Sequence, residues 1–143
     1  MMLNRKIKIR GEASIEWSKP EVLSPFSLNI ESETIANSYY RKVLFTGMNM
    51  QLVLMSLKPK EEIGLEIHAH VDQFFRIEKG EAIFVFPKEQ NKMRRFTDGD
   101  AIIVPAGTHH NIINNSEKED LKLYTIYSPP NHPPKTIQKE KIE

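Results

Sequence analysis

Short runs of β-branched, aromatic and other apolar residues, separated by turn residues, fill the chain after residue 50. The runs span Gln51–Leu57, Glu62–His70, Phe74–Phe86, Ala101–Val104, Asn111–Ile113 and Leu121–Tyr127. Each is predicted to be a strand, and Gly80 divides the third run with a hairpin turn. Ala101–Val104 is apolar at every position, as expected for a strand buried between two sheets. Turns about every ten residues favour a sandwich or closed barrel, which can hold a small ligand in its mouth.

The pattern changes before residue 50 and after residue 128. Glu31–Leu44 is predicted to hold a short helix with Ser32 as its N-cap. Two Pro-Pro pairs, which begin at Pro129 and Pro133, predict an extended arm over the surface, followed by a solvated, lysine-rich terminus. We therefore divide the chain into an N-terminal arm with edge strands (1–45), a barrel (46–130) and a C-terminal tail (131–143).

Composition narrows the possible functions. The 143 residues are enough for one domain with a sizeable core, and the formal net charge is only +1. A net charge this close to zero gives no sign of the basic surface that nucleic-acid binding requires. The absence of cysteine excludes disulfides, thiolate zinc sites and cysteine nucleophiles. No apolar run reaches the roughly 18 residues of a membrane span, and the N-terminal residues do not form a signal peptide, so we expect a cytoplasmic protein.

Several potential metal donors share one face of their predicted strands. Residues two apart on a strand point the same way, so Glu66, His68 and His70 are predicted to lie together. Downstream, His110 stands at the start of the next donor cluster, and the adjacent His109 takes the opposite face. This alternation predicts that two separate parts of the chain send donors to one place.

The segment after His70 adds one more inward donor. Gln73 shares a face with Phe75 and is predicted to point into the barrel. The opposite face carries Arg76 and Glu78, and this charged pair is predicted to lie in solvent. An amide oxygen is therefore expected beside the imidazole and carboxylate groups.

Imidazole nitrogen together with carboxylate or amide oxygen suits a divalent first-row metal such as zinc, manganese, iron or nickel. Three or four protein ligands leave positions open for water and a substrate. His132, in the proline-rich arm, is interpreted as a surface histidine, and the alternative is that the arm folds it back over the barrel mouth. Asn114 is interpreted as the residue that holds the turn after His110, not as a ligand.

The second donor cluster resembles a motif of the cupin superfamily. That motif is a glycine, five residues, Pro-x-Gly, two residues, a histidine, three residues and an asparagine. Gly99, Pro105, Gly107, His110 and Asn114 match it without a gap. This match is specific enough to predict the fold.

The first cupin motif matches with departures. Counting back from Gly80 places Gln73 where the family has glutamate, His68 at the second histidine and Glu66 at the first. Lys60 then stands where the motif opens with glycine. An alternative alignment takes His68 and His70 as the two histidines, which restores both imidazoles but leaves too few residues before Gln73. The residue spacing of the motif favours Glu66 as the ligand, whereas the motif's preference for two imidazole ligands favours His70.

The resemblance implies an all-β, cupin-type double-stranded β-helix, or jelly-roll barrel, with an N-terminal arm and a short C-terminal extension. The flanking strands resemble small single-domain bacterial cupins that are often labelled mannose-6-phosphate isomerase-like. The implied site is a divalent metal ion held by His68, Gln73, His110 and either Glu66 or His70. A homodimer through edge strands is also expected.

Three functions are consistent with such a site. The first is a metal-dependent reaction on a small oxygen-chelating molecule, such as sugar or sugar-phosphate isomerisation, in which Glu66 is the candidate base if it is not a ligand. The second is a dioxygenase, which needs a redox-active metal. The third is a barrel that binds a small molecule without turnover. The catalytic residues are not assigned by the sequence, and fold analogy does not establish a reaction.

Overall fold

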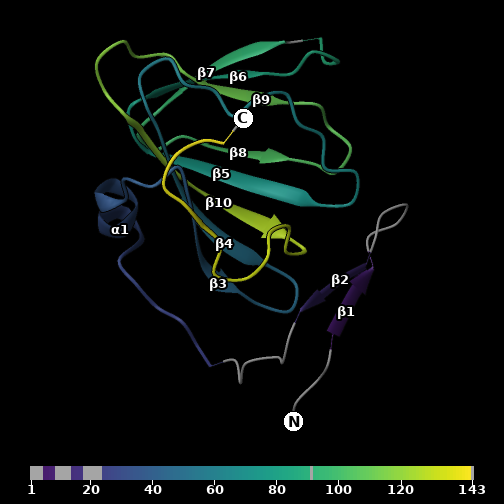
Figure 1. The fold of residues 1–143 in the computed structure, drawn as a ribbon. Coiled ribbons are helices and arrows are strands. Elements are labelled where there is room, and N and C mark those ends of the chain that lie inside the picture. Colours follow the sequence, from purple (N-terminus) through teal and green to yellow (C-terminus); the bar gives the residue numbers. More distant parts are fainter. Residues whose placement is uncertain (1–4, 9–13, 18–23, 91, 143) are drawn as a thin grey trace.

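The computed structural model describes residues 5–8, 14–17, 24–90 and 92–142, and apart from one short helix the regular secondary structure of these residues is β-strand (Figure 1). The elements are β1 (Arg5–Lys8), β2 (Ser14–Trp17), α1 (Ile30–Ala36), β3 (Arg41–Thr46), β4 (Gln51–Leu57), β5 (Asp72–Lys79), β6 (Glu81–Val85), β7 (Met93–Thr97), β8 (Ala101–Val104), β9 (Asn111–Asn114), β10 (Leu121–Ser128) and β11 (Ile137–Gln138). All pairings between strands are antiparallel. The predicted all-β class is confirmed.

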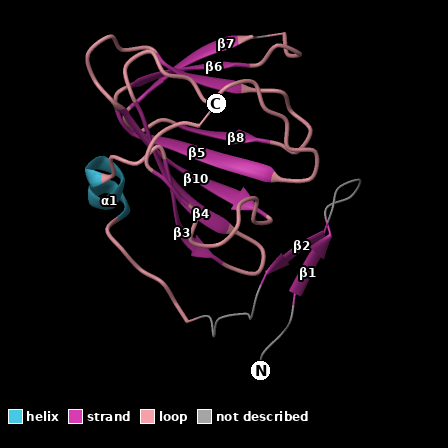
Figure 2. Ribbon diagram, in the orientation of Figure 1, coloured by secondary structure: helices cyan, strands magenta, loops and turns pink. Residues whose placement is uncertain are grey.

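Two sheets face each other across the core (Figure 2). The larger has the order β11-β3-β4-β10-β5-β8 and the smaller the order β7-β6-β9, while β1 pairs with β2 in a separate hairpin. Phe75 of the larger sheet meets Phe84 of the smaller edge to face, with ring centroids 5.3 Å apart. Each fully buried side chain of this kind contributes about 1.5–3 kcal/mol. The remaining core residues are Tyr40, Val43, Val53, Met55, Leu57, Val71, Ile77, Ala82, Phe86, Val104, Ile112, Leu121, Leu123 and Tyr127.

Gly80 occupies a turn, but the predicted hairpin is wrong. β5 pairs with β10 and β8, whereas β6 pairs with β7 and β9, so the chain crosses from one sheet to the other at this glycine. Gly80 has φ +100°, and a Cβ there would lie 3.0 Å from the carbonyl oxygen of Asp120. Glycine adopts this conformation without a steric penalty, which explains its place at the crossing.

Two predicted strands differ from the structure. Among the described residues of 62–70, only isolated bridges form, from Glu62 to Ile113 and from Glu66 to His110. Gly64, with φ +104°, interrupts regular pairing between them. Ala101–Val104 does form a strand, but among the described strands it is the edge strand β8, paired with β5 alone, and it does not lie between two sheets. Ile103 is accordingly 68% exposed.

The helix is shorter than predicted, and its cap is Asn29 rather than Ser32. The Asn29 side chain accepts a hydrogen bond from the Ser32 N–H at 2.9 Å. Helix α1 contacts β5 and β10 and covers part of the outer face of the larger sheet (Figure 1). Glu78 is therefore buried, at 4% exposure, and pairs with Arg76 at 2.9 Å, so the prediction that this glutamate faces solvent is wrong.

The segment after β10 packs against the larger sheet, as the predicted surface arm does, and part of the terminus that was predicted to be solvated forms β11. β11 pairs with β3, which places Ile137 opposite Lys42. The inward-facing Gln51 of β4 accepts hydrogen bonds from the backbone N–H groups of Asn131 and His132 at 3.0 and 2.9 Å. Gln51 also donates to the carbonyl oxygen of His132 at 2.7 Å. A buried polar side chain thus holds the arm against the barrel, as buried polar groups require partners.

Candidate metal centre

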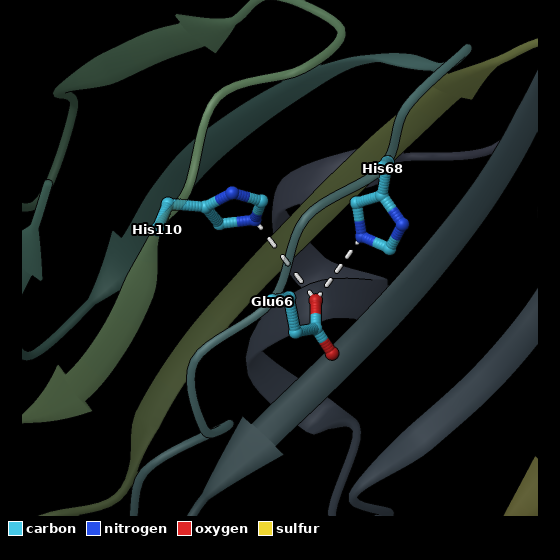
Figure 3. A group of neighbouring side chains, drawn as sticks. All are labelled: Glu66, His68 and His110. Atoms are coloured by element: carbon cyan, nitrogen blue, oxygen red, sulfur yellow. Dashed lines mark hydrogen bonds and ion pairs between the residues drawn. The ribbon is translucent and has the colours of Figure 1, made fainter. Parts of the chain in front are cut away.

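Backbone pairing fixes two donor residues opposite each other. Glu66 and His110 form an antiparallel bridge, with N–H to carbonyl distances of 2.8 and 2.9 Å in the two directions. Glu66 and His68 come from the irregular segment between β4 and β5, and His110 immediately precedes β9. The period-two spacing of Glu66 and His68 holds in this segment even though it is not a regular strand, and both side chains turn toward His110 (Figure 3).

These three side chains form a compact group. Nε2 of His68 lies 3.1 Å from Oε2 of Glu66, and Nε2 of His110 lies 3.9 Å from the same oxygen. One potential ligand atom from each residue lies within 4.8 Å of the other two. Donors that bind one metal at about 2 Å are separated by about 3–4 Å, so only a small contraction is needed. The geometry fits a single first-row ion.

His110 is prepared to act as a ligand. Its Nδ1 donates a hydrogen bond to the carbonyl oxygen of Thr108 at 2.9 Å, which leaves Nε2 as the atom with the free lone pair. Nε2 is buried and has no hydrogen-bond partner in the described part of the chain. Burial lowers the pKa of His110, although Thr108 and Glu66 act in the opposite direction. The ring is neutral at physiological pH, as metal binding requires.

Glu66 supplies a negative charge to the group. Burial alone would raise its pKa, but the hydrogen bond with His68 and the electrostatic interactions with His68, His110 and Arg41 outweigh burial and lower it. The carboxylate is therefore ionised at neutral pH. An ionised oxygen beside two imidazoles is a donor set that suits zinc, manganese, iron or nickel.

Gln73 is buried on the inner face of β5, as predicted, at 2% exposure. Its Nε2 donates to Thr125 Oγ1 at 2.9 Å. Its Oε1 is buried and has no partner among the described residues. In register, Gln73 stands opposite Tyr127, whose ring lies 5.8 Å from the His68 ring. Gln73 thus places an amide oxygen without a described partner on the inner sheet face where Tyr127 adjoins His68.

The structure places the other predicted residues outside the group of three. His70 is exposed in the turn that follows His68. Asn114 is fully buried, and its two amide N–H groups are shared among three backbone carbonyls, those of Leu57, Lys58 and Glu119. The structural role predicted for Asn114 is therefore confirmed. Lys60 has φ +63°, which explains why the cupin motif has glycine at this position.

Two residues near the group of three were missed or misread from the sequence. His132 is not a simple surface residue, because its Nε2 lies 3.2 Å from the hydroxyl of the buried Tyr127. Burial lowers the pKa of His132 to about 4. Arg41 belongs to β3, which begins inside the range that was predicted to hold a helix. The only sequence signal for β3 was the β-branched and aromatic content of Arg41–Thr46, which suits a strand.

Comparison with known proteins identifies the family. The cupin domain family matches residues 53–127, more than half of the chain. Uncharacterized protein L612 of Acanthamoeba polyphaga mimivirus is 53% identical over 112 residues, which are 78% of this chain and 70% of that protein. Uncharacterized protein YrkC of Bacillus subtilis is 48% identical over 122 residues, which are 83% of this chain and 65% of YrkC. The chain belongs to the cupin family.

Solved structures agree with this assignment. The crystal structure of BH2720 from Bacillus halodurans has a TM-score of 0.77 at 44% identity and covers 81% of this chain and 89% of its own. A Klebsiella pneumoniae protein with a double-stranded β-helix domain has a TM-score of 0.60 at 19% identity, covering 78% and 92%, and shows the fold alone. The predicted cupin-type double-stranded β-helix is confirmed. Across the described residues, no helix is long and apolar enough to span a membrane.

Proposed function

We propose that this cupin binds one divalent metal ion through Glu66, His68, His110 and Gln73, and uses it to hold a small oxygen-chelating molecule. The observation that supports this most directly is the buried Nε2 of His110, which is directed at Glu66 and lacks a hydrogen-bond partner in the described structure. A buried polar atom without a partner is costly, so its presence calls for an explanation. A metal ligand bond would satisfy it, and the same bond type would satisfy Oε1 of Gln73.

The donor set favours a Lewis-acidic site. Glu66 contributes the single negative charge, while two neutral imidazoles and one neutral amide contribute none. When bound, a divalent cation at such a site polarises a carbonyl or hydroxyl oxygen of the substrate. We infer that the substrates are hydroxy-ketones, keto acids or sugar phosphates, each of which presents two oxygens to one ion.

The proposed reaction is isomerase-like proton transfer next to a polarised carbonyl. Glu66 is ionised and would serve as a ligand, so it is not free to act as the base. His132 and Tyr127 provide a hydrogen-bonded pair on the adjoining wall, with Nε2 and hydroxyl oxygen 3.2 Å apart. Because the pKa of His132 is lowered to about 4, its ring is neutral at physiological pH and has a free lone pair, but it is a weak base. These residues are the candidates for proton transfer.

Metal analysis tests the site. The protein is purified without chelator, reconstituted with each of the four metals and measured for bound metal by elemental analysis. Near-stoichiometric metal is expected in the wild type, and strong loss is expected in His110→Ala. His109→Ala is the matched control, because it removes the adjacent imidazole that lies outside the group of three. Equal metal content in the wild type and His110→Ala would refute the proposed site.

Three further measurements separate the remaining possibilities. If Glu66 is the ligand supplied by the first cupin motif, the His70→Ala variant should still bind metal. If His70 is that ligand, the Glu66→Ala variant should still bind metal. Oxygen consumption with substrate and a redox-active metal would replace the isomerase hypothesis with a dioxygenase. Substrate binding by calorimetry, without turnover in either assay, would identify a binding protein.

The homodimer stays a prediction, and the edge strand β8 is the surface through which two copies could pair.

A further inference from the structure

We propose that Arg41 binds the carboxylate or phosphate group of the molecule held at the metal centre and so selects anionic ligands. This inference rests on the proposed function, because the same ligand must also reach the metal. It assigns a specificity role to a residue that belongs to neither cupin motif.

The strand geometry directs Arg41 toward the barrel interior. Arg41 pairs with Met55 of β4, and Val43, two residues along, pairs with Val53. Met55, Val43 and Val53 are all buried core residues. The side chain of Arg41 therefore starts on the inner face of the larger sheet. The next residue, Lys42, takes the opposite parity, and its Nζ lies over the ring of Tyr39 at 5.8 Å from the centroid.

The partners of the Arg41 guanidinium are neutral. Nη1 donates to Oε1 of Gln138 on β11, and Cζ lies over the Tyr40 ring, 5.1 Å from its centroid. None of the ion pairs formed by the described residues includes Arg41. Its Nε is buried and has no hydrogen-bond partner in that same part of the chain. A partly buried cation without a paired anion is costly, and this favours a role in binding.

Arg41 shares a sheet face with residues that adjoin the metal centre. It stands opposite Met55 of β4, which in turn stands opposite Leu123 of β10. Tyr127, four residues further along β10, has the same parity as Leu123, and its ring lies 5.8 Å from the His68 ring. Arg41 therefore belongs to the inner sheet face on which Tyr127 approaches His68. Once Glu66 is shared with a divalent cation, its single negative charge no longer balances the cation and the guanidinium together.

An anionic ligand would restore this balance. A guanidinium binds carboxylate and phosphate oxygens through charge-assisted, often bidentate hydrogen bonds. An α-hydroxy or α-keto acid, or a phosphorylated hydroxy-ketone, could place one oxygen group on the metal and its anionic group on Arg41. A neutral hydroxy-ketone could bind only to the metal.

Calorimetry with the metal-loaded protein tests the assignment. The probes are pyruvate for the carboxylate, dihydroxyacetone phosphate for the phosphate and dihydroxyacetone as the neutral chelator. Arg41→Gln should weaken binding of the preferred anionic probe by about tenfold or more, while binding of dihydroxyacetone and metal content remain unchanged. Arg41→Lys should recover part of the loss, because it keeps the charge without the planar fork. Lys42→Gln, the outward neighbour, is the matched control and should change nothing.

The outcomes separate this inference from the proposed function. Arginine-dependent binding in the pyruvate arm assigns a carboxylate ligand, and in the phosphate arm a phosphate ligand, and either result supports the role of Arg41. Full metal content with equal binding by the wild type and Arg41→Gln overturns the role of Arg41 and leaves the metal site intact. Failure of the wild type to bind metal overturns the proposed function and this inference with it.

Discussion

Two buried glutamines on the inner face of the larger sheet allow a matched test of how this interior is stabilised. Gln51 of β4 and Gln73 of β5 both stand opposite Tyr127 of β10. Gln51 makes four hydrogen bonds, two as donor and two as acceptor. Gln73 donates one, and its Oε1 has no partner among the described residues. We predict that the first residue is structural and that the second contributes little stability without metal.

The expected difference follows from the hydrogen bonds. Replacing either glutamine with alanine removes the same side-chain atoms, so the cost of the resulting cavity is similar in the two variants. Each net hydrogen bond contributes about 1 kcal/mol to the free energy of unfolding. Gln51→Ala should therefore be less stable than Gln73→Ala by about 3 kcal/mol, which corresponds to a Tm lower by about 10 °C in a chain of this length.

Urea unfolding followed by far-ultraviolet circular dichroism measures this difference, with chelator present so that metal does not contribute. Equal losses in the two variants, or a larger loss in Gln73→Ala, would refute the reasoning. A second series with metal extends the test. Added metal should stabilise the wild type and Gln51→Ala alike, and should stabilise Gln73→Ala less, because that variant lacks the amide oxygen.

Three further predictions concern stability and pH. Asn114→Ala should lower the free energy of unfolding by about 3 kcal/mol, since the loss removes two amide N–H groups that serve three backbone carbonyls and the Oδ1 that accepts from the Ser116 N–H; a loss below about 1 kcal/mol in urea unfolding would contradict this. Gly80→Ala should cost about 1–3 kcal/mol because of its φ of +100° and the contact with Asp120, whereas Gly99→Ala, with open space around its Cβ, should lose less in the same assay. His132 has a folded pKa of about 4, below the ordinary 6.5, so the unfolded state binds more protons between these values and stability falls as the pH drops through this window. His132→Gln should remove up to about 3 kcal/mol of that fall, and identical pH profiles for the two proteins would exclude the effect.

The sequence predicts the inner face of β5 well and its outer face poorly. Gln73 and Phe75 point inward because alternation along a strand is a local property. Glu78 was expected in solvent, yet α1, from a segment more than forty residues earlier in the chain, covers that part of the outer face. The sequence of the strand alone cannot show that a helix from elsewhere in the chain covers its outer face.

The metal centre likewise contains residues that local spacing predicts and residues whose position depends on distant contacts. Glu66, His68 and His110 could be grouped from spacing, because two short motifs carry their positions. Arg41 and His132 could not, because their inward placement depends on β11 pairing with β3 and on Gln51 holding the arm. Both contacts join residues about eighty or more positions apart, and a charged residue near a strand is ordinarily expected to face water.

The backbone bridge between Glu66 and His110 has a consequence for how this site can evolve. The two hydrogen bonds that set the spacing of these residues involve only main-chain atoms, at 2.8 and 2.9 Å. Replacing either side chain by another donor would therefore change the chemistry of the site without removing what positions it. Exchange of Glu66 for histidine or aspartate would alter charge and softness, and with them the order of preference among metals. A cupin barrel of this kind can thus acquire a new metal, and with it a new reaction, through single substitutions on an unchanged frame.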